Sequence, residues 1–68
     1  MDEEVFNTSI RKFLKKVGIT SQIEIEKVIL DALANGKIDL DTVCRVSVKL
    51  ETDLSDKPLV IDGEIHLT

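Results

Sequence analysis

The chain is poor in the residues that build metal and cofactor sites. It contains one cysteine, one histidine, two phenylalanines and no tryptophan or tyrosine. A single cysteine excludes an intramolecular disulfide and a thiolate cluster for zinc or iron–sulfur. The three glycines are widely separated and form no phosphate-binding loop. No set of reactive groups converges in the sequence, so we expect neither enzymatic activity nor a metal site or cofactor.

Long apolar runs are also missing. No run approaches the roughly 20 residues that a membrane-spanning helix needs, and the acidic start Met-Asp-Glu-Glu is unlike a secretory signal. We therefore expect a soluble cytoplasmic protein without a membrane span. The net charge of −4 argues against nucleic acid as a partner.

What the chain does have is aliphatic residues in a short length. Hydrophobic residues make up 43% of the 68 positions, which is normal for a globular chain. This length predicts a single domain over residues 1–68, near the lower size limit for an unassisted core. So small a core stabilises weakly, and we therefore expect a protein partner or a homodimer.

The first half of the chain predicts two helices joined by a tight bend. The first runs over about residues 2–17, with Asn7 or Thr8 as the alternative N-cap. Its apolar face consists of Phe6, Ile10, Phe13, Leu14 and Val17. Gly18 can take the left-handed conformation that ends a helix. Ser21, with Glu24 three residues later, forms a capping box that starts the next helix. These signals together predict a helical hairpin.

The second predicted helix runs over about residues 22–34 and ends at Asn35-Gly36. Its main apolar face consists of Ile25, Val28, Ile29, Ala32 and Leu33. A second apolar row lies on nearly the opposite side and consists of Ile23, Leu30 and Ala34. Because both rows need cover, we expect the sheet that follows to lie over the second row. The alternative is that this row is a partner surface.

The second half predicts an antiparallel β-hairpin, because apolar and polar residues alternate over about residues 42–51 and 59–67. Residues 52–58 have loop composition. A turn at Asp62-Gly63 would mix apolar and charged residues on one face, so we expect a straight strand there. Residues 37–40 are a candidate third strand. The class is α+β, with the sheet packed on the helices.

Two registers satisfy the alternation of the hairpin equally well. One places Leu50 opposite Ile61, with Lys49 facing Asp62 on the outer side. The other is shifted by two residues. Its pairs are Leu50 with Leu59 and Arg45 with Glu64. Both place opposite charges across the strands, so the sequence leaves this choice open.

Four bases make the one basic patch, a candidate anion-binding surface: Arg11, Lys12, Lys15 and Lys16. The bent helices also suggest a winged-helix nucleic-acid binder, but the second predicted helix, which would read the bases, carries Glu24, Glu26 and Asp31, and these acids would repel phosphates. His66 lies on the polar side of the last strand and lacks a second metal ligand. Cys44 lies on the apolar side of its predicted strand and is expected to be a buried, inert thiol.

The opening of the chain resembles an uncharacterised family of short bacterial proteins of unknown function. The resembling stretch reads Phe6-Asn7-Thr8-Ser9-Ile10-Arg11-Lys12-Phe13-Leu14-Lys15, then Val17-Gly18-Ile19-Thr20-Ser21-Gln22 and Glu24-Ile25-Glu26. Asp62-Gly63-Glu64-Ile65 resembles the family's closing stretch, whereas Thr8 and Ile23 depart from its pattern. The resemblance implies a bacterial origin and carries over no catalytic residue. We expect a non-catalytic interaction or assembly module, with winged-helix-like nucleic-acid binding as the alternative.

Overall fold

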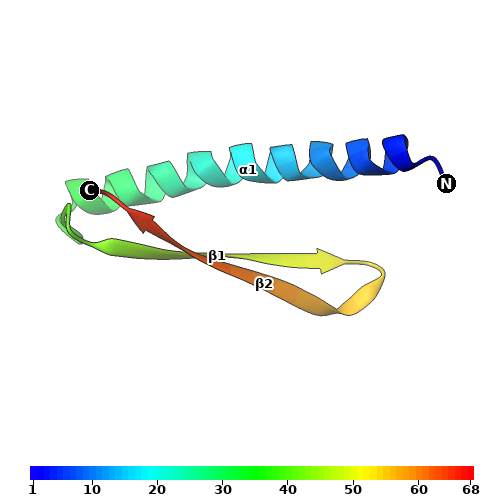
Figure 1. The fold of residues 1–68 in the computed structure, drawn as a ribbon. Helices are drawn as coiled ribbons and strands as arrows, with labels where there is room; N and C mark the ends of the chain where they lie inside the picture. The colour runs from blue at the N-terminus through cyan, green and yellow to red at the C-terminus, as the bar shows by residue number, and fades with distance from the viewer. The chain divides into compact units, whose positions relative to one another are not determined.

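The computed structural model describes residues 1–68 and contains one helix and one β-hairpin. Helix α1 spans Glu3–Ala34, strand β1 spans Val43–Thr52 and strand β2 spans Ser55–His66 (Figure 1). The chain divides into two units, residues 1–37 with the helix and residues 38–68 with the hairpin. The predicted α+β class is confirmed, while the single domain over residues 1–68 stays a prediction.

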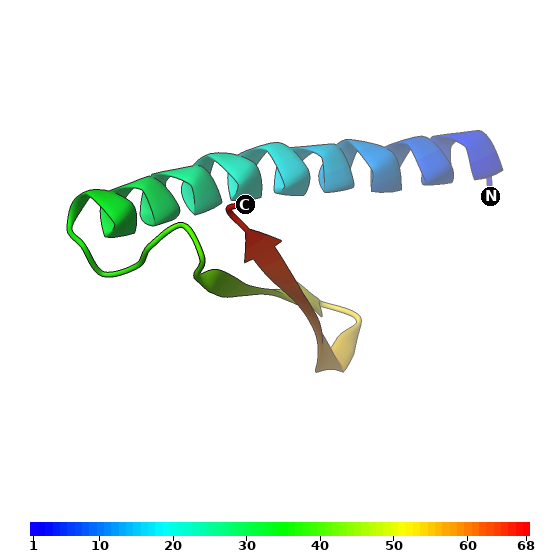
Figure 2. The same ribbon diagram turned by 60° about the vertical axis from the view of Figure 1, so that its left-hand side comes forward.

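Helix α1 is unbroken, so the predicted helical hairpin with helices over residues 2–17 and 22–34 is wrong (Figure 2). Gly18 lies inside the helix and does not have a positive φ, and Ser21 is a helical residue that caps nothing. A lone glycine costs a helix about 1 kcal/mol relative to alanine, which weakens the helix without ending it. No proline stands near this position to force a break.

The apolar residues before and after Gly18 lie on the same side of one continuous helix. The prediction of a bend did not take this into account. One row continues along the helix at spacings of 4, 3, 4, 4, 3 and 4 residues. This row, which we call the apolar stripe, consists of Ile10, Leu14, Val17, Ser21, Ile25, Val28 and Ala32. At 100° per residue its members share a sector of about 80°. Two helices separated by a turn have no reason to keep a common phase.

The N-terminus of α1 is capped by Asp2. Its carboxylate oxygen Oδ1 accepts hydrogen bonds from the backbone N–H groups of Glu4, at 3.0 Å, and Val5, at 3.2 Å. Glu3 and Glu4 place further negative charge in the first turn, where it interacts favourably with the helix dipole. The helix therefore begins where the acidic start of the chain predicts.

The C-terminus of α1 closes with a Schellman motif, as the predicted end at Asn35-Gly36 requires. Gly36 has a φ of 70°, and its N–H donates to the carbonyl of Leu33 at 3.2 Å. The N–H of Lys37 donates to the carbonyl of Ala32 at 2.9 Å. Glycine is favoured here because it adopts a left-handed conformation without a Cβ clash.

The hairpin has the second of the two registers that the sequence left open. Leu50 pairs with Leu59, and Arg45 pairs with Glu64. The strand runs straight through Asp62-Gly63, so the rejection of a turn at this point is confirmed. One face of the hairpin is apolar, and we call it the hairpin face. It consists of Cys44, Val46, Val48, Leu50, Leu59, Ile61, Gly63 and Ile65.

The connection between the strands is shorter than predicted, because β2 already begins at Ser55. Only Asp53 and Leu54 lie between the strands, and Thr52 pairs with Ser55. The register shift between Leu50 and Thr52 leaves one residue of β1 opposite three of β2, residues 56–58. The third of these is proline, which has no N–H to donate and is tolerated at such an irregularity.

The predicted third strand over residues 37–40 is absent, and the sheet has two strands. Asp39 instead organises a turn. Its Oδ1 accepts a hydrogen bond from the N–H of Asp41 at 2.9 Å, and its own N–H donates to Oγ1 of Thr42 at 3.0 Å. Aspartate commonly stabilises turns by bonding the backbone two residues ahead, which competes with strand formation.

Neither unit contains a buried side chain. The most covered residues of α1 are half-buried, and the same is true of the hairpin, where Cys44, Val46 and Ile65 are the half-buried members of the hairpin face. Both the helix and the hairpin therefore carry apolar side chains along one side, and these side chains stay exposed or half-buried.

We expect Gly18→Ala to stabilise α1 by about 1 kcal/mol, because alanine has the higher helix propensity and its Cβ would meet no atom within 4 Å. Gly36→Ala should destabilise by about 1 kcal/mol, since a non-glycine residue is strained at positive φ. Urea unfolding followed by circular dichroism measures both. Opposite signs for the two variants support the continuous helix, whereas destabilisation by Gly18→Ala would restore the predicted bend.

The register of the hairpin can be tested by exchanging a charge pair. Arg45→Glu should cost about 0.5 kcal/mol, because it places two carboxylates opposite one another. The double variant Arg45→Glu with Glu64→Arg should recover that loss in urea unfolding. In the alternative register Arg45 faces His66, and the second substitution would bring no recovery.

Candidate interaction surfaces

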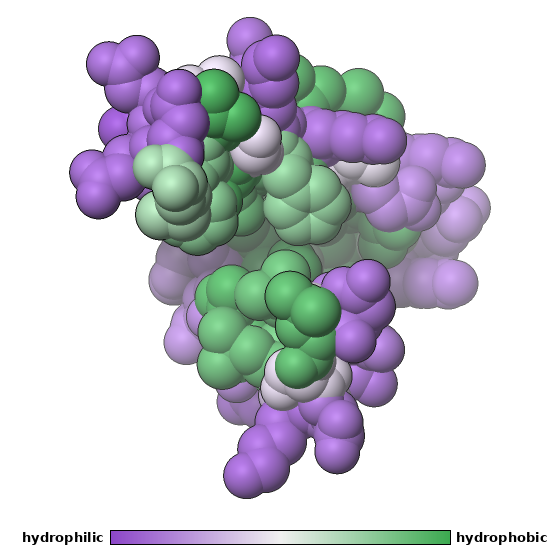
Figure 3. Space-filling model, turned by 90° about the vertical axis from the view of Figure 1, so that its right-hand side faces the viewer, coloured by the Kyte–Doolittle hydropathy of each residue, from purple (hydrophilic) through white to green (hydrophobic).

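The apolar stripe is the longest of the exposed surfaces. Leu14 is 54% exposed and Val28 56% exposed, although both side chains belong to the most apolar side of the helix. Val17 and Ile25, between them, are half-buried. Figure 3 shows apolar side chains open at the surface of the protein among polar ones. The stripe therefore combines exposed apolar side chains with half-buried ones.

The second apolar row, Ile23, Leu30 and Ala34, is exposed as well, and its cover by the sheet stays a prediction. Ile23 is 64% exposed and Leu30 63% exposed. Ile19, at 52%, extends this row toward the N-terminus. The row is shorter than the apolar stripe because the positions before Ile19 on that side are occupied by lysines.

The basic patch lies on the N-terminal half of α1, and its four members are exposed: Arg11, Lys12, Lys15 and Lys16. None of them takes part in a salt bridge. At 100° per residue they occupy the side of the helix away from the apolar stripe. The structure thus shows a solvated charged side and adds no group that would bind an anion there.

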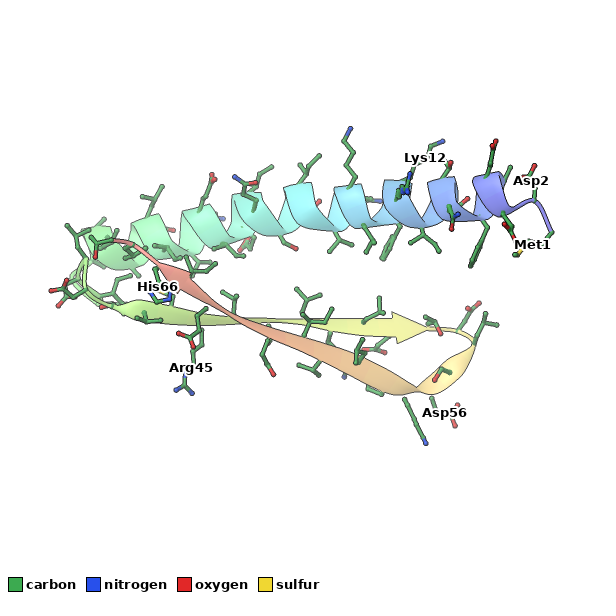
Figure 4. The ribbon with its side chains drawn as sticks, in the orientation of Figure 1. Met1, Asp2, Lys12, Arg45, Asp56 and His66 are labelled. Carbon is green, nitrogen blue, oxygen red and sulfur yellow. The ribbon has the colours of Figure 1, made fainter.

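The hairpin places most of its apolar side chains on one face, whereas Val43 and Val60 lie on the polar side. Cys44 is a free, half-buried thiol on the hairpin face. His66 is on the polar side, where its Nε2 lies 3.9 Å from Oε2 of Glu64, with both side chains largely exposed. Arg45 and His66 lie toward the open end of the hairpin and Asp56 lies near its turn (Figure 4). The exposed pair of His66 with Glu64 contributes little to stability.

No chemistry-bearing cluster is formed. A hollow of 310 Å³ runs along α1, lined by Glu4, Val5, Thr8, Ser9 and Lys12. Another, of 450 Å³, lies on the hairpin, lined by Arg45, Val46, Asp62, Gly63 and Glu64. Most of these side chains are exposed, and none is buried. No group of three or more histidine, cysteine, aspartate or glutamate residues is placed to hold a metal ion.

The residues that sequence reasoning missed are the stripe members Leu14 and Val28. In the sequence they belong to the apolar faces of two separate predicted helices and are not among the candidate surface residues. Once α1 is continuous, no interface between two helices exists and these side chains face outward. Their common phase, visible in the sequence, was the signal that could have identified them.

Comparison with known proteins gives one match. The whole chain, residues 1–68, matches DUF6494, a family of unknown function. The chain belongs to this family. No curated protein and no solved structure matches it. The resemblance inferred from the opening residues is confirmed, and it assigns no role to DUF6494; the bacterial origin stays a prediction.

No helix of this DUF6494 protein is both long and apolar enough to cross a membrane.

We expect no binding to duplex DNA near physiological salt, because the net charge is −4 and the acidic residues of α1 offset its bases. A gel-shift assay with random duplex measures this, and Lys12→Glu with Lys16→Glu should leave the result unchanged. Binding by the wild type that this double variant abolishes, with a steep dependence on salt, would contradict the prediction.

Proposed function

We propose that this DUF6494 protein is a non-catalytic interaction or assembly module, and that the apolar stripe of α1 is its contact surface. The observation that carries the proposal is the absence of any buried side chain in a chain that is 43% hydrophobic. Contiguous apolar surface left in water marks interaction sites in small proteins.

Energetics supports a partner for the helix. Burying a Val, Leu or Ile side chain contributes about 1.5–3 kcal/mol, and two members of the stripe, Leu14 and Val28, are more than half exposed. Helices in proteins owe most of their stability to packing of an amphipathic face and little to propensity alone. A partner along the stripe would therefore stabilise α1 and be bound by it at the same time.

The competing functions have less support. A winged-helix protein reads DNA with the second of two bent helices, and this chain has one continuous helix at that place. An enzyme needs reactive groups brought together in a pocket, whereas the hydroxyls and charges here line open hollows. The cytoplasmic location expected from the sequence stays a prediction.

The proposal can be tested by placing charge on the stripe. Immobilised wild-type chain is exposed to cell lysate and, separately, to purified chain, and the retained protein is measured. Leu14→Glu with Val28→Glu should abolish specific retention, because an unpaired carboxylate cannot be buried in an apolar contact.

The matched control makes the same chemical change on the second row, Ile23→Glu with Leu30→Glu. This control should retain what the wild type retains. Loss of retention with the control alone would move the contact to the second row, and equal retention by all three chains would refute the proposal.

A further inference from the structure

We infer that the partner of the apolar stripe is a second copy of this chain, with the two α1 helices antiparallel and related by a two-fold axis at Ser21. This inference rests on the proposed function of the stripe as a contact surface. Three properties of α1 carry it: the symmetry of the stripe, the distribution of charge along the helix, and the period of the stripe.

The spacing of the stripe reads the same in both directions. From Ile10 to Ala32 the steps are 4, 3, 4, 4, 3 and 4 residues, with Ser21 at the centre. A two-fold axis at Ser21 sets each member opposite another member. The resulting pairs are Ile10 with Ala32, Leu14 with Val28, Val17 with Ile25, and Ser21 with itself. Such self-complementarity is what an isologous contact between identical chains requires.

The net charges of two segments of α1 favour the antiparallel orientation. Residues 11–16 carry four bases and no acid, a charge of +4. Residues 24–31 carry three acids and one base, so their charge is −3 + 1 = −2. A parallel pair would lay the two +4 segments side by side, whereas the antiparallel pair lays each +4 segment along a −2 segment. Because the basic patch lies on the side of α1 away from the stripe, the charges of the two chains are farther apart than the roughly 8–10 Å between packed helix axes, and salt screens much of their interaction.

The period of the stripe suits two nearly straight helices. Its pattern repeats after 11 residues, as from Leu14 to Ile25 or from Val17 to Val28. Eleven residues in three turns is close to the natural period of an α-helix, so the row stays on one side along about 33 Å of axis with little supercoiling. The small Ser21 at the centre permits close approach, and one polar residue in an apolar seam favours a single register.

Cross-linking between two single-cysteine chains tests orientation and register together. Both chains carry Cys44→Ser; one adds Leu14→Cys, and the other, enlarged by a tag, adds Val28→Cys. Mild oxidation of the mixture should give mainly the mixed disulfide, resolved by size on a non-reducing gel. The matched control is Lys12→Cys mixed with Leu30→Cys, whose numbers have the same sum but whose positions lie off the stripe, and it should give little cross-link.

Sedimentation equilibrium of the wild-type chain supplies the second measurement. We expect a monomer–dimer equilibrium, and Leu14→Glu should raise the dissociation constant by at least about 10-fold. Disulfides joining like with like would overturn the antiparallel arrangement.

A monomer at every concentration would overturn self-association. If the stripe variant still lost a different protein retained from lysate, the proposed function would stand without the dimer. If no retention depended on the stripe, both proposals would fail.

Discussion

Burial of the apolar row on α1 is the constraint on which the rest of this structure depends. The row keeps one phase from Ile10 to Ala32, and helices of mixed composition owe their stability mainly to covering such a face. The caps at Asp2 and Gly36 define where the helix starts and stops, but a cap contributes only about 1 kcal/mol. Caps alone do not account for 32 helical residues, and we propose that contacts along the stripe contribute to the stability of α1.

The hairpin has the same requirement in another geometry. Its two strands place apolar residues on one face and, apart from Val43 and Val60, charged or polar residues on the other, and isolated two-stranded sheets are marginal in water. The two outer edges of the strands carry unpaired backbone groups because no third strand follows. In both units the local sequence pattern produces an apolar face that no side chain buries. This shared exposure is the reason for proposing a role in assembly.

The alternation of apolar and polar residues predicted the strands but not how they pair. Alternation with a period of two identified both strands and the straight course through Gly63, because a shift by one residue would turn the apolar side chains outward. It could not choose between registers two residues apart, since both keep the faces intact. In the observed register, the irregularity of the sheet lies beside Pro58. Where such an irregularity falls depends on which residues of the two strands pair, and the pattern within one strand does not show this.

The helical half shows what the sequence alone determined and what it did not. Its ends follow from Asp2 and Asn35-Gly36, where side-chain and glycine chemistry act within a few residues. Gly18 and Ser21 carry signals of the same local kind, yet the helix continues through them. A glycine weakens a helix by an amount that the rest of the helix can offset, so whether it ends there depends on the whole. Local chemistry set the caps and the faces; the three-dimensional structure decided that one helix, and not two, presents the apolar stripe.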